Sequence, residues 1–173
     1  MYSRGHQSPP SRFPLDLYCV LAVYHAKRDV LVKLDRVQTR FIRDAGLTEI
    51  DALMKFNLAP LAARRDIAML GLIHRTVLGK GPRHFKEHFK MLSSGNLHDP
   101  RTAIGGELVK RSALGLAAIY NMLPSRCRKQ TSVKFFQTEL QRILKERATE
   151  SCEDWVQTFS PRLPTTKHPL LSI

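Results

Sequence analysis

The sequence predicts an all-α protein, an irregular bundle of about five to seven helices. Three segments repeat apolar residues at steps of three and four, which is the spacing of a helix with one buried face. In the first half of the chain, helix periods, caps and breaks also follow one another without conflict. At 173 residues, 43% of them hydrophobic and 25% charged, the chain is most simply one globular domain, which we place at residues 15–160.

The N-terminal part of the chain divides into a polar tail and a short apolar run. Residues 1–14 contain three prolines and few apolar side chains, so we expect a disordered tail. Residues 17–24 carry no charge but are too few to cross a bilayer, which needs about 20 apolar residues. A signal peptide is the alternative interpretation, which the adjoining Asp16 disfavours. We expect a buried first helix or strand and no contact with a membrane.

The first long helix is predicted at residues 31–45. Its buried stripe consists of five apolar side chains on one helical face: Leu31, Leu34, Val37, Phe41 and Ala45. The basic side chains lie mainly off this stripe: Lys33, Arg36, Arg40 and Arg43. Gly46 is placed to end the helix, because glycine readily adopts the left-handed backbone conformation found there.

A short second helix and a central helix are predicted next. Thr48 offers a hydroxyl N-cap, and Glu49 and Asp51 put negative charge in a first turn where the helix dipole favours it. Pro60 bounds the turn that follows. Residues 61–78 are apolar on nearly every side, as expected of a helix surrounded by others, so we predict that they form the centre of the core.

A long loop is predicted near residues 92–108. Glycine and proline stop the central helix at residues 79–82. The loop segment contains three glycines and a proline and shows little periodicity. Two arrangements stay open, since the loop either separates subdomains at 15–91 and 108–160 or crosses a single core.

Two further helices are predicted in the second half. Residues 112–122 form a short helix that ends before Pro124. Thr131 or Ser132 then caps a strongly amphipathic helix. Its predicted buried stripe is Val133, Phe136, Leu140, Ile143 and Leu144.

The C-terminal residues carry a weak helical signal and then a proline-rich stretch. Trp155 and Phe159 stand four residues apart, which places them on one face of a further short turn of helix. Residues 161–173 contain three prolines, and we expect them to form a flexible tail. Their last apolar residues do not suffice for a membrane anchor.

The charge balance indicates a polyanionic partner. Lys and Arg number 28 against 15 Asp and Glu, which leaves a net charge of +13 and a pI near 10.2. Residues 101–147 hold ten Lys or Arg and three Glu, so more than half of this net charge lies in about a quarter of the chain. Positive charge before a helix opposes the helix dipole, which favours phosphate contact as its purpose. A solvated basic face is the alternative.

No residue set indicates an enzyme, a metal or a cofactor. Cys19, Cys127 and Cys152 stand far apart, a sparse set that fits a reducing compartment, the cytoplasm or the nucleus, and opposes a disulfide framework or a zinc knuckle. His84 and His88 share a helix spacing, but two ligands are too few for zinc. A nucleophile–base pair and a phosphate-binding loop are also missing from the sequence.

Three segments of the chain carry motifs in a characteristic order. They are LDRVQTRFIRDAGL at 34–47, FNLAPLAARRDIAMLGLIHRTVLGKGP at 56–82, and AIYNMLPSRCRKQTSVKFFQTELQRIL at 118–144. Together they resemble the region that follows the polymerase core in non-LTR (LINE-type) retrotransposon reverse transcriptases. That region shows a Leu-(Glu/Asp)-Arg-Val-Gln-Arg-Arg helix, a helix opening with paired arginines, and a Trp-Asn-Ser-Leu-Pro segment. Here Tyr120 stands in the tryptophan position.

The resemblance implies a non-catalytic C-terminal fragment that binds nucleic-acid backbone through basic helices. The polymerase palm holds two divalent ions on an Asp-Asp turn, and this sequence has no Asp-Asp pair. Backbone contacts position without specifying, so binding to RNA or DNA should be weakly sequence-selective and strongly salt-dependent. The missing polymerase core is a second candidate partner. An inert remnant, or a helical protein-interaction scaffold without nucleic-acid binding, is the alternative.

Nine basic side chains are the predicted backbone contacts. They are chosen by charge clustering, and the first five also by their place in the matching motifs: Arg36, Arg40, Arg43, Arg64, Arg65, Arg126, Arg128, Lys129 and Lys134. Arg64 and Arg65 have an alternative role, because each could pair with a carboxylate and fix one helix on another. The carboxylates considered for this role are Asp66, Glu49 and Asp51.

Overall fold

The computed structural model confirms the all-α prediction. It describes four stretches of the chain, residues 26–99, 107–110, 112–150 and 152–172. Within these stretches lie eight α-helices and no strand beyond a single isolated bridge. Two of the helices, α6 (Glu107–Lys110) and α8 (Ser125–Arg128), are single turns that periodicity does not reveal. The predicted N-terminal tail and the apolar run at 17–24 lie outside the described residues.

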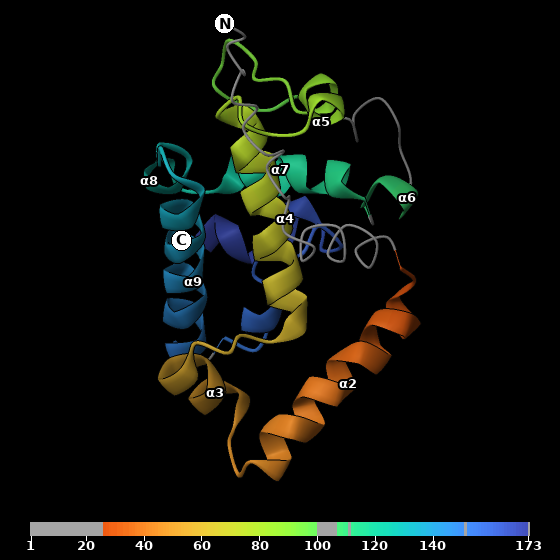
Figure 1. Ribbon diagram of the computed structural model, residues 1–173, viewed down its shortest axis with the longest axis vertical. Coiled ribbons are helices and arrows are strands. Elements are labelled where there is room, and N and C mark those ends of the chain that lie inside the picture. Colours follow the sequence, from red (N-terminus) through yellow and green to blue (C-terminus); the bar gives the residue numbers. More distant parts are fainter. Residues whose placement is uncertain (1–25, 100–106, 111, 151, 173) are drawn as a thin grey trace, which may run out of the picture.

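The core is built on the central helix that the sequence predicts. α4 (Leu61–Val77) buries side chains around most of its circumference, among them Met69, Leu70 and Ile73. The long helix α9 (Val133–Thr149) packs along it, and α7 (Leu116–Met122) crosses the bundle beside them (Figure 1). A single hydrophobic cluster extends from α3 (Glu49–Phe56) to the C-terminal segment. The two halves of the chain therefore share one core.

Packing of α9 follows its predicted stripe. Phe136, Leu140, Ile143 and Leu144 are buried in the common core, while Val133 is only half-buried at the end of the stripe. The predicted cap residue Ser132 occupies the N-cap position, although its side chain makes no capping hydrogen bond.

The described part of the predicted loop, residues 92–99, contains no helix but is held firmly to the core. Gly95 makes a tight turn at a positive φ of 75°, and Met91 pairs with Leu97 across it. The Asn121 side chain, on α7 (Leu116–Met122), accepts a hydrogen bond from the Leu97 N–H at 2.7 Å and donates one to its carbonyl oxygen at 2.9 Å. Leu97 is thereby fixed in the core.

The prediction of a flexible tail at 161–173 is wrong for its described residues. The chain there forms two short 3-10 helices, Thr165–Lys167 and Pro169–Ser172. Leu170 is only 4% exposed within the core cluster. Prolines impose an extended or turn-like backbone without preventing packing, and Leu170, which follows the last proline, reaches the core. The predicted further turn of helix is a 3-10 helix, Trp155–Gln157, and both Trp155 and Phe159 are buried.

The helix α2 (Arg28–Asp44) lies at the edge of the bundle and projects away from α9 (Figure 1). Gly46 ends the helix at a φ of 69°, as predicted. The predicted cap of α3 (Glu49–Phe56) is confirmed, because the Thr48 hydroxyl accepts a hydrogen bond from the Asp51 N–H at 3.0 Å. None of the helices in the described stretches combines the length and apolar character that a membrane span requires.

The predicted buried stripe of α2 is wrong. Of its five residues only Leu31 is buried, whereas the others are exposed to solvent. The helix instead turns Leu31 and Ile42 toward the bundle, with the polar Asp35 and Gln38 between them. These two polar residues bind α4 and the turn before it, so hydrogen bonds decide which face is inward. Hydrophobic periodicity alone could not reveal this choice.

Candidate nucleic-acid interface

The exposed length of α2 carries a row of four basic side chains. Lys33, Arg36, Arg40 and Arg43 follow one another at steps of three and four, so they share one side of the helix. The row covers about 15 Å, the axial length of four to five phosphates of one duplex strand at about 3.4 Å each. Arg43 approaches Asp44 at 4.0 Å, and both side chains are largely exposed, which makes a weak pair.

The row is oriented by an ion pair on the opposite side of α2. Arg65 of α4 donates two hydrogen bonds to the Asp35 carboxylate, at 2.7 and 3.1 Å. Gln38 Nε2 donates to the Ala59 carbonyl oxygen at 2.9 Å. These contacts, with Leu31 packed beside them, hold the basic row toward solvent.

Arg65 therefore has the structural role that the sequence analysis gave as its alternative. Its carboxylate partner is Asp35, thirty residues earlier in the chain, and not one of the three that were considered. Arg64, its neighbour, lies in the first turns of α4 with an exposed side chain. Among the described residues no hydrogen bond or ion pair of the Arg64 side chain is found, so its charge is available.

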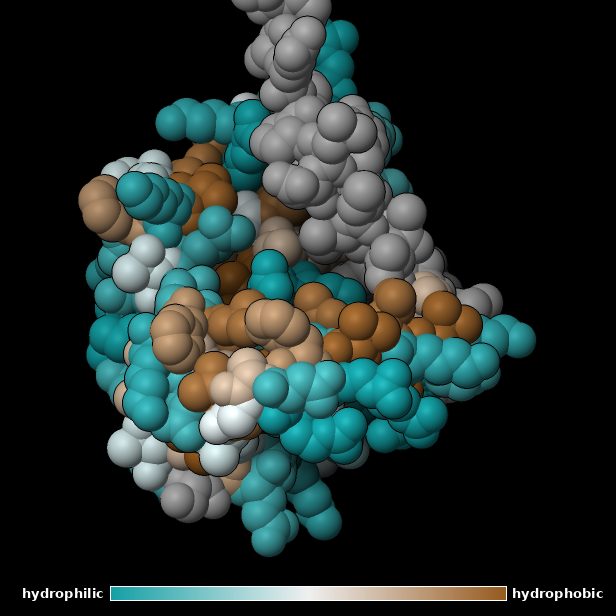
Figure 2. Space-filling view, turned by 60° about the horizontal axis from the view of Figure 1, so that its bottom comes forward, coloured by the Kyte–Doolittle hydropathy of each residue, from teal (hydrophilic) through white to brown (hydrophobic). Residues whose placement is uncertain are grey.

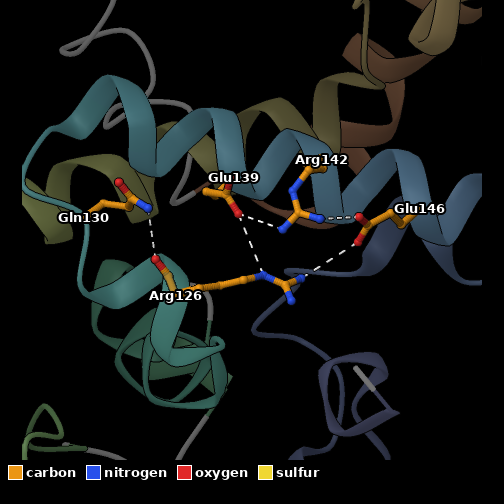
Figure 3. A network of polar contacts seen from close by, with 5 residues as sticks. All are labelled: Arg126, Gln130, Glu139, Arg142 and Glu146. Atoms are coloured by element: carbon orange, nitrogen blue, oxygen red, sulfur yellow. Dashed lines mark hydrogen bonds and ion pairs between the residues drawn. The ribbon is translucent and has the colours of Figure 1, made fainter.

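The second predicted cluster surrounds α8 and the start of α9, far from α2 (Figure 1). Figure 3 shows that Arg126 reaches from α8 toward two carboxylates of α9, Glu139 at 3.7 Å and Glu146 at 3.9 Å. Arg142 binds the same two carboxylates along α9. Two arginines and two glutamates thus neutralise one another at the surface.

Electrostatics within this network favours the ionised pairs. The hydrogen bond from Arg142 lowers the pKa of Glu139 and raises the pKa of Arg142. Both glutamates are at least a quarter exposed, so the pairs are worth little in stability, but they reduce the positive field that a phosphate would meet.

The other members of this cluster differ in their availability. Arg128 donates hydrogen bonds to the Gly95 carbonyl oxygen and to Asn96 Oδ1, which ties α8 to the loop. Lys129 and Lys134 are exposed, and no partner of either side chain is found in the described part of the chain. The nine predicted contacts therefore do not form one surface. We leave Arg65, Arg126 and Arg128 out of the candidate interface because of their structural partners.

Sequence reasoning missed two features of α2. Lys33 belongs to the basic row but is absent from the nine predicted contacts, although the sequence analysis already placed it off the apolar stripe with Arg36, Arg40 and Arg43. The second feature is a row of exposed apolar side chains beside the basic one: Val30, Leu34, Val37 and Phe41. In Figure 2 it is the brown band along α2, which continues onto α3 and borders the teal basic side chains.

A cavity of about 300 Å³ lies between α2, α4 and the C-terminal segment. Its lining includes three arginines, Arg28, Arg65 and Arg162, and two aspartates, Asp35 and Asp66. Arg65 and Asp35 neutralise each other, and Asp66 is buried with a partner of its own. The cavity is thus closely balanced in charge and offers no distinct anion site.

His74 is a buried polar residue whose hydrogen bonds have a structural role in the core. His74 Nε2 lies 2.8 Å from the Gln130 carbonyl oxygen, which can only accept, so Nε2 carries the proton and Nδ1 accepts from the Tyr120 hydroxyl at 2.9 Å. The ring stacks on Phe136 at 4.1 Å between centroids. Burial lowers the pKa of His74 and raises that of Tyr120 to about 12. Burial also raises the pKa of the Cys127 thiol, so it is a poor nucleophile.

Neither a metal site nor a known relative identifies a function for this chain. Within the described residues, no group of three or more His, Cys, Asp or Glu side chains is placed to hold a metal ion. Comparison with protein-family models, curated proteins and solved structures found no match. The resemblance to LINE-type reverse transcriptases thus stays a prediction from the sequence motifs.

Proposed function

We propose that this chain is a non-catalytic helical module that contacts nucleic-acid backbone through the basic row of α2. In this proposal it is related to the C-terminal, post-polymerase part of a LINE-type reverse transcriptase. The observation that carries the proposal is the row Lys33, Arg36, Arg40 and Arg43, which the Arg65–Asp35 pair turns toward solvent. Contacts from side chains to phosphates position a duplex without reading its bases.

Three further cations supplement the row in this proposal. Arg64 lies in the first turn of the helix on which α2 is anchored. Lys129 follows α8, Lys134 lies in the first turn of α9, and both are exposed. The motif that contains Arg36 and Arg40 also carries the resemblance, so sequence and geometry agree best on α2. The net charge of +13 adds long-range attraction for any polyanion.

A second candidate function, a protein-interaction scaffold, is favoured by one observation. Val30, Leu34, Val37 and Phe41 leave an apolar row uncovered on α2. Exposed apolar patches mark sites of interaction with other proteins, among other uses. The missing polymerase core, or another helical protein, is the partner that this row would suit.

A salt titration tests the nucleic-acid proposal. The full chain is titrated onto a labelled RNA–DNA hybrid and onto a non-nucleic polyanion of equal charge, at several salt concentrations. We expect tighter binding to the hybrid, with log affinity falling against log salt by about 0.7 to 0.9 for each phosphate contact. Changing Lys33, Arg36, Arg40 and Arg43 together to Ser should lower that slope by about three.

The matched control changes four exposed basic residues far along the chain from α2, in the segment that follows α4 and includes α5 (Arg83–His88). They are Lys80, Arg83, Lys86 and Lys90, each changed to Ser. This control loses the same formal charge and should keep the hybrid slope nearly unchanged. Equal losses in the two variants, or equal binding to both polyanions, would show that only bulk charge is at work.

A further inference from the structure

The apolar row of α2 has the spacing of a coiled-coil seam. Val30, Leu34, Val37 and Phe41 follow at steps of four, three and four, the alternation of a and d positions in heptads. Val37 is 68% exposed and Phe41 is 62% exposed, although both stand in the middle or second half of a 17-residue helix. A single exposed leucine or valine is ordinary, but a continuous seam of four is a docking face.

The two flanks of this seam differ in charge and in whether a partner helix can reach them. With Leu34 at a and Val37 at d, the g positions are Lys33 and Arg40. Both side chains are exposed, and neither has a hydrogen bond or ion pair with another described residue. The e positions are Leu31 and Gln38, which pack against the bundle. A helix lying on the seam would therefore meet positive charge along one side and the bundle along the other.

This asymmetry selects the occupant. A second copy of the chain in antiparallel pairing would set Lys33 and Arg40 against the same residues of its partner, and like charges at flanking positions oppose association. Parallel pairing would need the e positions, which α2 uses for its own core. A helix with acidic residues beside its apolar stripe complements the flank in either direction.

We infer that α2 docks an amphipathic helix of a partner protein, with Leu-like residues in the seam and Glu or Asp facing Lys33 and Arg40. This goes beyond nucleic-acid binding, because it uses the apolar side of α2 and leaves Arg36 and Arg43 facing solvent. The partner helix packs its knobs between Val30, Leu34, Val37 and Phe41. The acidic flank sets partner choice, and the seam supplies most of the affinity.

Two designed peptides test the inference with the full chain. Each has about 21 residues, three heptads with Leu at every a and d position; one carries Glu and the other Lys at e and g. Fluorescence anisotropy measures the affinity of each labelled peptide. We expect the Glu peptide to bind at least about tenfold more tightly than the Lys peptide. The K33E/R40E variant should reverse this preference.

Neutral substitutions separate the seam from the charge. V37S/F41S should weaken binding of the Glu peptide by about tenfold or more, while leaving binding to the RNA–DNA hybrid near its original value. The matched control is F135S, since Phe135 on α9 is also 62% exposed. It should leave peptide affinity unchanged. Circular dichroism and thermal unfolding verify that all variants remain folded.

Several results would overturn the inference. Binding of both peptides with equal affinity, or of neither, would remove the acidic helix as occupant. Sedimentation showing a dimer that V37S/F41S dissociates would assign the seam to a second copy. A hybrid affinity that falls as much as peptide affinity in V37S/F41S would assign the same side chains to nucleic acid. Each of these failures is distinct from a failure of the salt titration.

Discussion

Among single residues, His74 is the one whose burial has the clearest measurable consequence. It is neutral in the folded protein, because removal from water lowers its pKa and both ring nitrogens are satisfied by Gln130 and Tyr120. In the unfolded chain its pKa returns to about 6.5. Between these two values the unfolded state binds a proton that the folded state does not, so stability falls as the pH falls.

The first prediction is a loss of stability below about pH 6.5, with a slope of at most about 1.4 kcal/mol per pH unit from this residue. Urea unfolding at pH 7.5, 6.5 and 5.5 measures the slope. The His74→Gln variant should be less stable at every pH but should lack this contribution. Identical slopes in the two proteins would contradict the prediction.

At the scale of the helices, the long helices could be predicted from sequence, but the single turns α6 and α8 and the orientation of α2 could not. Caps and breaks are local signals, and Thr48, Gly46 and the apolar circumference of α4 acted as predicted. α2 has apolar residues on two of its faces. Leu31 and Ile42 lie on one face, and Leu34 and Val37 lie on the other. The choice between them depends on Arg65, which is distant in sequence.

The second prediction therefore concerns the pair that sets this orientation. Arg65→Met and Asp35→Asn should each destabilise the protein, because each leaves a half-buried group without its partner. The double variant should lose less than the sum of the two single variants, with a coupling energy of about 1 kcal/mol. Urea unfolding of the four proteins gives the double-mutant cycle.

The Arg43→Met and Asp44→Asn cycle is the matched control, since this pair is longer and largely exposed. Its coupling should be close to zero. If the Arg65–Asp35 cycle were equally flat, the pair would not be what selects the inward face of α2, and the hydrogen bond from Gln38 would be left as its determinant.

Across the whole molecule, charge was predictable in amount and unpredictable in arrangement. The total of +13 is a property of composition. The ten basic residues between 101 and 147 suggested one phosphate-binding cluster, yet Arg126 folds against Glu139 and Glu146 of α9. These two carboxylates stand about two helical turns apart on α9 and lie well beyond Arg126 in the sequence. Only the packing of α8 against α9 brings these groups together. On the described surface, the longest single-helix row of exposed basic side chains lies instead on α2, at Lys33, Arg36, Arg40 and Arg43.

The same long-range packing joins the C-terminus to the core. The segment Pro169–Ser172 contacts α7, and Leu170 is only 4% exposed, so the end of the chain closes the cluster that begins in α3. Composition predicted a loose tail because prolines dominate the segment. An apolar residue at a chain end reveals its packing partner only when the rest of the fold is in place.

The last prediction tests whether this closure stabilises the whole protein. Leu170→Ala should lower the free energy of unfolding by about 2 to 5 kcal/mol, the cost of removing a buried leucine side chain. Leu171→Ala is the control, because the Leu171 side chain is 59% exposed and its removal should change the free energy of unfolding little. Urea unfolding compares the two variants, and amide hydrogen exchange in α7 shows where protection is lost. If the C-terminal segment were a flexible tail, neither substitution would change the free energy of unfolding. If Leu170 closes the core, only Leu170→Ala should lower that free energy and speed amide exchange in α7.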